Sequence, residues 1–286
     1  MTIREAQIMG GSHLVILGAG ASIASSFRNP ELNGRKLPSM NDLPKVVDLS
    51  DILSQLPPEL ICKNFEELYG RIYEWDKNSK WLKEINDRIY AYFSSLELPK
   101  EPTIYDYLIM SLRDKDVIAT FNWDPFLLQA LLRNYRHGSS PELLFLHGNV
   151  AIGYNEEIKS VGKAGFYGET SGKYYEPTKL MFPVKHKNYT DDEFIRSQWE
   201  RFELCLHHAK RVTVFGYSAP KSDVEAISAM QKAWGTSQQR NLEQFELIDI
   251  RDEDEVKESW DGFIHSHHYD YCKDFFQSSI AQYPRR

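Results

Sequence analysis

The sequence predicts an α/β protein with a Rossmann-like, doubly wound parallel sheet. Short apolar runs recur along the chain, and each ends in a polar or glycine-bearing turn that leads into a helical pattern. The runs are His13–Gly18, Asp116–Asn122, Leu143–His147, Val212–Gly216 and Phe245–Arg251. Nearly continuous apolar strands suit a parallel sheet covered on both faces. Their alternation with helices therefore predicts a doubly wound core.

Composition restricts the class of protein further. The chain has 286 residues, of which 42% are apolar, which is enough to bury a full core and excludes a disordered chain. The 34 Lys and Arg residues against 41 Asp and Glu residues give a net charge of -7. Such a chain has no overall basic field, so we expect no direct contact with nucleic acid.

The spacing of the cysteines and the length of the apolar runs indicate the cellular compartment. Cys62, Cys205 and Cys272 are far apart and odd in number, which fits neither a disulfide framework nor a zinc site of paired thiolates. The longest apolar run, Leu14–Ala21, is too short to span a bilayer. We therefore expect a cytoplasmic protein in a reducing compartment, without a membrane partner.

Between the strands, the sequence predicts one domain over 1–286 with two insertions. About a hundred residues separate the first two strands, so a helical insertion is expected at about 42–113. Apolar residues at helical spacing predict amphipathic helices over Phe65–Tyr73 and Trp81–Phe93. A loop-rich insertion is expected at about 151–190, with one strand near Lys179–Lys185. The histidines and cysteine of His265–Cys272 are expected to form a solvated terminal element and not a metal site.

The first strand runs into a glycine-rich turn, Gly18-Ala19-Gly20-Ala21-Ser22, that opens a helix. Glycines let the backbone approach a pyrophosphate, and the N–H groups of a helix N-terminus favour its negative charge. Ile23 replaces the third glycine of the dehydrogenase fingerprint, which disfavours a hydride-transferring enzyme. A tight turn that binds no ligand is the alternative.

Polar residues end the next two strands. Asn122 can donate and accept hydrogen bonds, and Asp124 begins the following helix. His147 ends the third strand and could act as a general base near neutral pH. The alternatives are that Asn122 and Asp124 are helix caps and that His147 is structural.

These three segments resemble the sirtuin superfamily, whose motifs are a glycine-alanine-glycine turn, a threonine-x-asparagine-x-aspartate strand end and a histidine-glycine pair, in this order. Residues 216–223 are similar to the glycine-tyrosine-serine-x-proline-x-x-aspartate signature of the bacterial sirtuin-like (Sir2-like) branch. The predicted helix over Phe194–Ala209 also suits that branch. The resemblance covers His13 to about Arg251.

Departures from the pattern favour one branch of the superfamily. Protein deacylases carry a zinc module with two cysteine pairs after the catalytic histidine, whereas this chain has no cysteine between Cys62 and Cys205. Phe121 stands where deacylases usually have glutamine, and Leu37–Met40 is the nearest substitute for their proline-containing loop. The chain therefore resembles the zinc-free, sirtuin-like NADases of bacterial antiphage defence.

This resemblance implies an NAD+ hydrolase that releases nicotinamide and ADP-ribose, uses no metal and depletes cellular NAD+. By analogy, Asn122 positions the ribose or a water, Asp124 orients the strand end, and His147 accepts a proton. The residues implied in NAD+ binding are Gly18, Ala19, Gly20, Ala21 and Ser22 at the pyrophosphate, and Gly216, Tyr217, Ser218 and Asp249 near the adenosine. Two rival functions are an NAD+-dependent protein deacylase and a catalytically silent nucleotide-binding scaffold.

An enzyme that destroys NAD+ must be controlled. Only about 35 residues follow the region of resemblance, fewer than an independent sensing domain usually has. We therefore expect a homo-oligomer, a separately encoded sensor such as a defence ATPase or an argonaute-type protein, or both. The aromatic-rich helices between Phe65 and Phe93 are the candidate interface.

Overall fold

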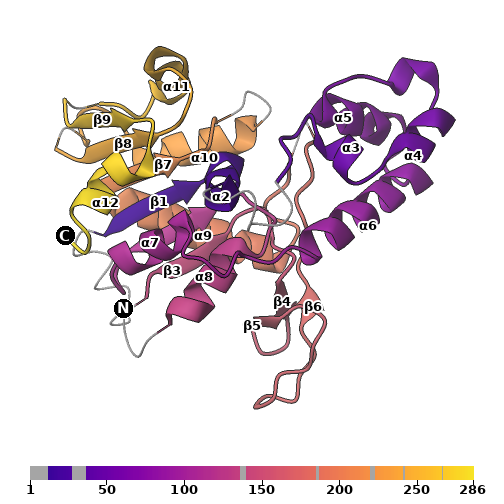
Figure 1. Cartoon of the computed structure of the whole chain (residues 1–286), viewed down its shortest axis with the longest axis horizontal. Helices are drawn as coiled ribbons and strands as arrows, with labels where there is room; N and C mark the ends of the chain where they lie inside the picture. Colours follow the sequence, from indigo (N-terminus) through magenta and orange to yellow (C-terminus); the bar gives the residue numbers. More distant parts are fainter. Residues whose placement is uncertain are drawn as a thin grey trace.

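A computed structural model of the chain describes residues 12–27, 37–135, 140–184, 187–219, 223–240, 242–265 and 267–286 (Figure 1). Within these residues, six parallel strands form the central sheet, in the order β3-β2-β1-β7-β8-β9. The strands are β1 (His13–Leu17), β2 (Val117–Thr120), β3 (Glu142–Phe145), β7 (Arg211–Phe215), β8 (Gln244–Ile248) and β9 (Tyr269–Cys272). Counted within the sheet, this is the order 3-2-1-4-5-6 of doubly wound dinucleotide-binding folds. The predicted fold class is confirmed.

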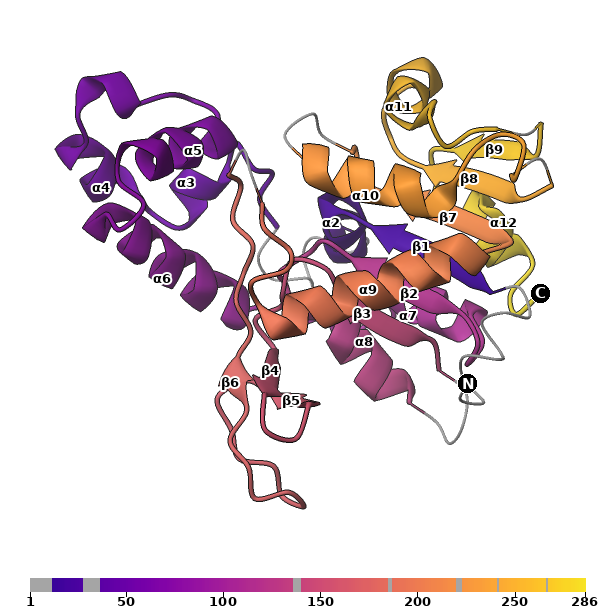
Figure 2. The same ribbon diagram turned by 180° about the vertical axis from the view of Figure 1, so that it is seen from behind.

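Helices cover both faces of this sheet (Figure 2). Alternate residues of β1 face opposite sides, since Leu14 and Ile16 join one hydrophobic core and Val15 and Leu17 join the other. The first core is covered by α9 (Glu193–His208), α10 (Val224–Trp234) and α11 (Glu253–Trp260). The second is covered by α2 (Ala19–Phe27), α7 (Ile104–Ser111), α8 (Phe126–Asn134) and α12 (Ser279–Gln282), with η2 (Phe275–Gln277).

A group of helices between β1 and α7, here called the helical lobe, lies to one side of the sheet (Figure 1). It contains α3 (Leu43–Val46), α4 (Ser50–Gln55), η1 (Pro58–Leu60), α5 (Phe65–Trp75) and α6 (Lys80–Ser94). The last two confirm the predicted amphipathic helices. Asn64 and Ser79 cap them by accepting hydrogen bonds from backbone N–H groups of the first turn. Most of the apolar residues of α5 and α6 are buried in the lobe core.

The segment expected to be loop-rich also contains a small antiparallel sheet, while most of its other described residues lie outside strands and helices. Its strands, in the order β5-β4-β6, are β4 (Ile152–Asn155), β5 (Ser160–Lys163) and β6 (Glu176–Pro177). The strand predicted near Lys179–Lys185 was wrong, because residues 179–184 belong to no strand and Lys185 lies outside the described residues. Pro183 lacks the N–H group that a strand would need. The Met181 N–H donates to the His147 carbonyl, so this segment packs on the end of β3.

The C-terminal element was predicted only in part, since His267 and His268 are exposed but a strand was missed. Residues expected to be solvated include β9, which pairs with β8 in parallel from Tyr269 to Cys272. Its sequence mixes polar and aromatic residues, as an edge strand can, so it lacks the continuous apolar run of the inner strands. Ser266, within this predicted element, lies outside the described residues.

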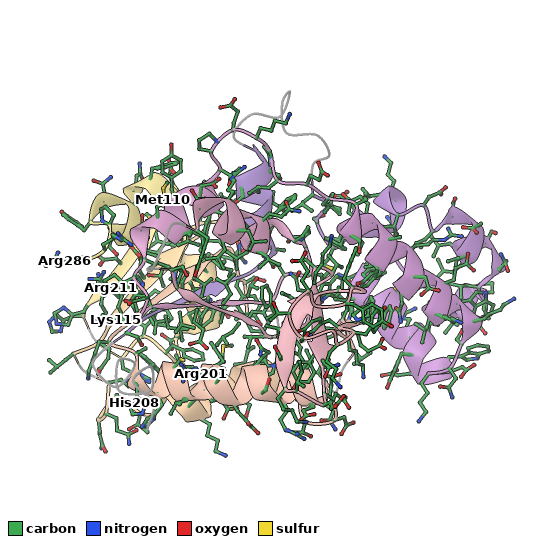
Figure 3. All side chains as sticks on the ribbon, turned by 90° about the horizontal axis from the view of Figure 1, so that it is seen from below. Met110, Lys115, Arg201, His208, Arg211 and Arg286 are labelled. Atoms are coloured by element: carbon green, nitrogen blue, oxygen red, sulfur yellow. The ribbon has the colours of Figure 1, made fainter. Side chains whose placement is uncertain are left out.

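The two ends of the sheet differ in character. Figure 3 shows the labelled cationic side chains of Lys115, Arg211 and Arg286 at the end of the molecule away from the helical lobe. Arg211 begins β7, so this is the amino edge of the sheet. The carboxyl edge faces the lobe (Figure 1). In the part of the chain that the structure describes, no helix is long and apolar enough to cross a membrane.

Candidate functional site

A cavity of about 350 Å³ lies where the carboxyl edge of the sheet meets the helical lobe. Its size falls within the range of small-molecule sites, roughly 300–1,000 Å³. It includes the point between β1 and β7 where the strand order reverses, which is where open α/β sheets bind ligands. The predicted site residues that line it are Gly18, Ala19, Ser22, Asn122, Asp124, His147, Gly216, Tyr217 and Ser218. Residues from four strand ends therefore meet in one cavity.

The glycines of the β1–α2 turn let it pack closely against the turn that follows β7. A Cβ atom on Gly20 would lie 2.8 Å from the Gly216 Cα, and one on Gly18 would lie 2.5 Å from the Gly216 carbonyl oxygen. The Gly20 N–H donates to that same oxygen at 2.9 Å. Gly20 and Ala21 are not among the residues that line the cavity. Gly20 therefore packs against the turn after β7, and its predicted approach to a pyrophosphate stays a prediction.

Most amides of this turn are used within the protein. The Gly18 N–H donates to the Phe215 carbonyl at 3.1 Å, and the Ala21 N–H donates to the Gly18 carbonyl at 3.0 Å. An anion at this end of α2 would therefore rely on the other amides, such as that of Ala19, together with the helix dipole.

Asn122 is held by a buried hydrogen-bond network. Its side-chain amide donates to the Gly18 carbonyl and to the Ser22 hydroxyl, both at 2.8 Å. The Ser22 hydroxyl also bonds the Tyr105 hydroxyl at 2.7 Å. Because the side-chain N–H groups of Asn122 donate to acceptors within the protein, its Oδ1 atom is the group that can accept a hydrogen bond from a ligand. The network ties the β2 end to the glycine turn.

Asp124 is buried at the start of α8. Its carboxylate accepts a hydrogen bond from the Phe126 N–H at 3.1 Å, although the N-cap residue of the helix is Pro125 and not Asp124. Burial raises its pKa from 3.8 to about 6, an effect opposed by hydrogen bonds from Ser22 and from backbone. The fully buried Asn149, which sequence reasoning missed, donates to the Asp124 carbonyl at 2.6 Å and fixes this loop.

His147 is buried among aromatic rings. The edge of its ring meets Phe121 at a centroid distance of 4.8 Å, and its Nε2 atom lies 3.3 Å from the Tyr189 hydroxyl. Burial and the nearby Lys187 ammonium hold the pKa of His147 well below its usual value. The imidazole is therefore neutral at neutral pH, as a proton acceptor must be.

Several charged or polar lining residues were missed by the sequence reasoning. Lys187 and Asp223 form a buried ion pair in the wall, and the Tyr217 hydroxyl donates to Asp223 at 2.9 Å. Asn64 and Glu66 line the cavity from the start of α5. Asp223 ends the fourth motif, which was a signal that could have pointed to it, whereas nothing in the sequence pairs it with Lys187.

Two predicted parts of the site are not among the described residues that line the cavity. Asp249 follows β8 and is not among the lining residues; its carboxylate accepts a hydrogen bond from Arg251 at 2.8 Å. Its contact with an adenosine stays a prediction. Pro220, Lys221 and Ser222 of the fourth motif lie outside the described residues. Leu37–Met40, the substitute for the deacylase loop, lines the cavity.

Among the described residues, the structure contains no group of three or more His, Cys, Asp or Glu side chains that could hold a metal ion. Cys62, Cys205 and Cys272 form no disulfide within the described residues, and Cys205, on α9, is buried in the core.

No protein-family model and no curated protein matches this chain. Solved structures of Sir2 enzymes do align with it. One, from a study of the mechanism and regulation of Sir2 enzymes, is 13% identical, with 99% of this chain and 96% of that chain covered and a TM-score of 0.44. A Sir2 homologue in complex with NAD is 13% identical, with 97% and 88% covered and a TM-score of 0.40. A Sir2 complex with an inhibitor, 2'-O-acetyl-ADP-ribose and a deacetylated p53 peptide is 12% identical, with 97% and 93% covered and a TM-score of 0.40. The fold class is shown by the order of the six strands and not by these alignments.

Proposed function

We propose that this protein is an NAD+ hydrolase that cleaves the N-glycosidic bond and releases nicotinamide and ADP-ribose. The observation that carries the proposal is the meeting of Asn122, Asp124 and His147 in one cavity at the reversal point of a dinucleotide-binding sheet order. The resemblance to sirtuin-like NADases supports it. The substrate would extend from the turns at Gly18 and Gly216 towards Asn122 and His147.

The side chains suit this reaction. As the bond from C1' of the ribose to the nicotinamide nitrogen breaks, its electron pair leaves with nicotinamide and positive charge grows on the ribose. The buried Asp124 carboxylate would stabilise that charge. The Asn122 Oδ1 atom would orient the ribose or the water whose oxygen bonds to C1'. The neutral His147 imidazole would take the proton that the water loses.

The direct test is to incubate the purified protein with NAD+ and to separate the products by chromatography. Equal release of nicotinamide and ADP-ribose without any acylated peptide is expected. Nicotinamide release that requires an acylated peptide would instead establish the protein deacylase. Binding of intact NAD+ with no products would establish the silent scaffold.

The activity should depend on the charge of Asp124. Because burial raises the pKa of this carboxyl to about 6, kcat/KM is expected to fall as the pH is lowered through about 6 and Asp124 takes up a proton. His147 stays neutral there, since its pKa is well below its usual value. In Asp124→Asn, a slower enzyme should lack this acid limb. A wild-type profile that is flat from pH 5 to 8 would contradict the assignment.

The proposed role in the cell is depletion of NAD+ as an antiphage defence effector, controlled by self-assembly or by a separate sensor protein. Most apolar residues of α5 and α6 are buried in the lobe, but Tyr73 and Trp75 are exposed, at 42% and 54%. Light scattering across a dilution series is expected to show an oligomer. NAD+ turnover per chain, measured on the same samples, is expected to fall as the oligomer dissociates. A fully active monomer, independent of concentration and partner, would refute this control.

A further inference from the structure

The cavity wall beside His147 contains a buried ion pair that the proposed reaction does not use. The Lys187 ammonium contacts the Asp223 carboxylate, and their side chains are only 5% and 7% exposed. Desolvation offsets much of the attraction in such a pair, so stability alone is a poor explanation for it. The pair joins the segment before α9 to the residue before α10. Its position suggests that it fixes the geometry of the wall.

Contacts lead from this pair to the imidazole by two routes. On one side, Tyr217 donates its hydroxyl to Asp223 and stacks on Phe121 at 4.1 Å, and Phe121 packs against His147. On the other side, Lys187 is two residues before Tyr189, whose hydroxyl lies 3.3 Å from the His147 Nε2 atom. The first route is a series of side-chain contacts, and the second passes along the chain from Lys187 to Tyr189.

Tyr189 is itself held in place by packing on α9. Its aromatic ring stacks on Trp199 of α9 at a centroid distance of 4.3 Å. The Trp199 indole N–H donates to the Leu146 carbonyl at 3.0 Å, next to His147 in the chain. Burial raises the pKa of Tyr189 above its usual value, so the phenol remains neutral. A neutral hydroxyl can accept a hydrogen bond from an imidazole N–H.

We propose that Tyr189 is a positioning residue for His147, anchored by the Lys187–Asp223 pair, and that it accepts a hydrogen bond from the Nε2–H group. The Nδ1 atom is then unprotonated and is the ring nitrogen left to accept a proton from the ribose or water. This inference rests on the proposed function only in taking His147 as the base. The arrangement of the imidazole is a property of the protein without substrate.

Histidine side-chain NMR tests the arrangement without any assay of activity. Two-bond ¹⁵N–¹H correlation spectra of ¹⁵N-labelled protein report the tautomer of each imidazole, and His147→Gln identifies the His147 signals. The Nε2–H tautomer is expected in the wild type. In Tyr189→Phe, which keeps the stacked ring and removes only the hydroxyl, the Nε2 signal should shift as the hydrogen bond is lost.

A matched control is available in the lobe. Tyr69 is also a buried tyrosine that stacks on an aromatic ring, Phe182, at 5.1 Å, and its hydroxyl donates to Asn86 at 2.9 Å. Tyr69→Phe therefore removes the same atom from a similar environment and should leave the His147 signals unchanged. Asp223→Asn should shift them in the same way as Tyr189→Phe, and Lys187→Arg should preserve them because it keeps the ion pair.

Kinetics complete the test. One hydrogen bond is worth about 0.5–1.5 kcal/mol, so Tyr189→Phe should lower kcat by about 2- to 13-fold with little change in KM. An Nδ1–H tautomer in the wild type, or His147 signals unaffected in Tyr189→Phe, would overturn the proposal. The expected spectra from a protein that does not cleave NAD+ would leave the positioning intact and refute only the proposed function.

Discussion

Replacing His147 with glutamine is expected to lower the rate of nicotinamide release from NAD+ by about 10²–10⁴-fold, the usual effect of losing a general base. Glutamine keeps a polar side chain of similar length in the buried wall, so the melting temperature should change little. Chromatography of the products and circular dichroism measure the two effects. His207→Gln, an exposed position at the end of α9, is the matched control and should be fully active. Wild-type turnover by His147→Gln would show that His147 is not the base.

Asn122→Ala should reduce turnover to a similar degree but should also destabilise the protein. The lost amide donates to both Gly18 and Ser22, so its removal takes one hydrogen bond from each of these buried groups, which keep their bonds to Ala21 and Tyr105. Each lost hydrogen bond costs about 0.5–1.5 kcal/mol. The two variants should therefore differ in melting temperature while sharing the catalytic defect.

The second large effect is expected from Gly216→Ala, which should disrupt the turn after β7. Gly216 has a φ of +61°, and a Cβ atom there would lie 2.3 Å from the Ala21 nitrogen. Left-handed strain of about 1–2 kcal/mol adds to about 1–3 kcal/mol for overpacking. At about 2–4 °C per kcal/mol for a chain of this size, the melting temperature should fall by about 4–20 °C.

Gly70→Ala provides the comparison for this variant. Gly70 lies within α5, and a Cβ atom there would meet nothing within 4 Å. Alanine in the middle of a helix should raise stability by about 0.5–1 kcal/mol. Calorimetry of both variants measures the contrast. A Gly216→Ala protein as stable as the wild type would contradict the packing of the two turns.

The features that were predicted from sequence follow from local patterns. Each inner strand is a short apolar run, and parallel strands bring their ends to one edge, so the meeting of Asn122 and His147 could be expected. The edge strand β9 has no such run. Gly20 shows another limit, because its close neighbour Gly216 is distant in the chain, so the contact between them could not be predicted from local sequence. Lys187 and Asp223 likewise pair across 36 positions, without a periodic signal.

The helical lobe contributes one wall of the cavity, and the sheet edge contributes the other. Asn64, Glu66 and Phe93 line it from the lobe, whereas Asn122, Asp124 and His147 line it from the sheet. The lobe lies entirely between β1 and β2 in the chain. If the protein hydrolyses NAD+ as proposed, the lobe residues that meet the ligand and the sheet residues that act on it lie in separate stretches of sequence. Exchange of the lobe is then expected to change which ligand fits, while the side chains at the sheet edge stay as they are.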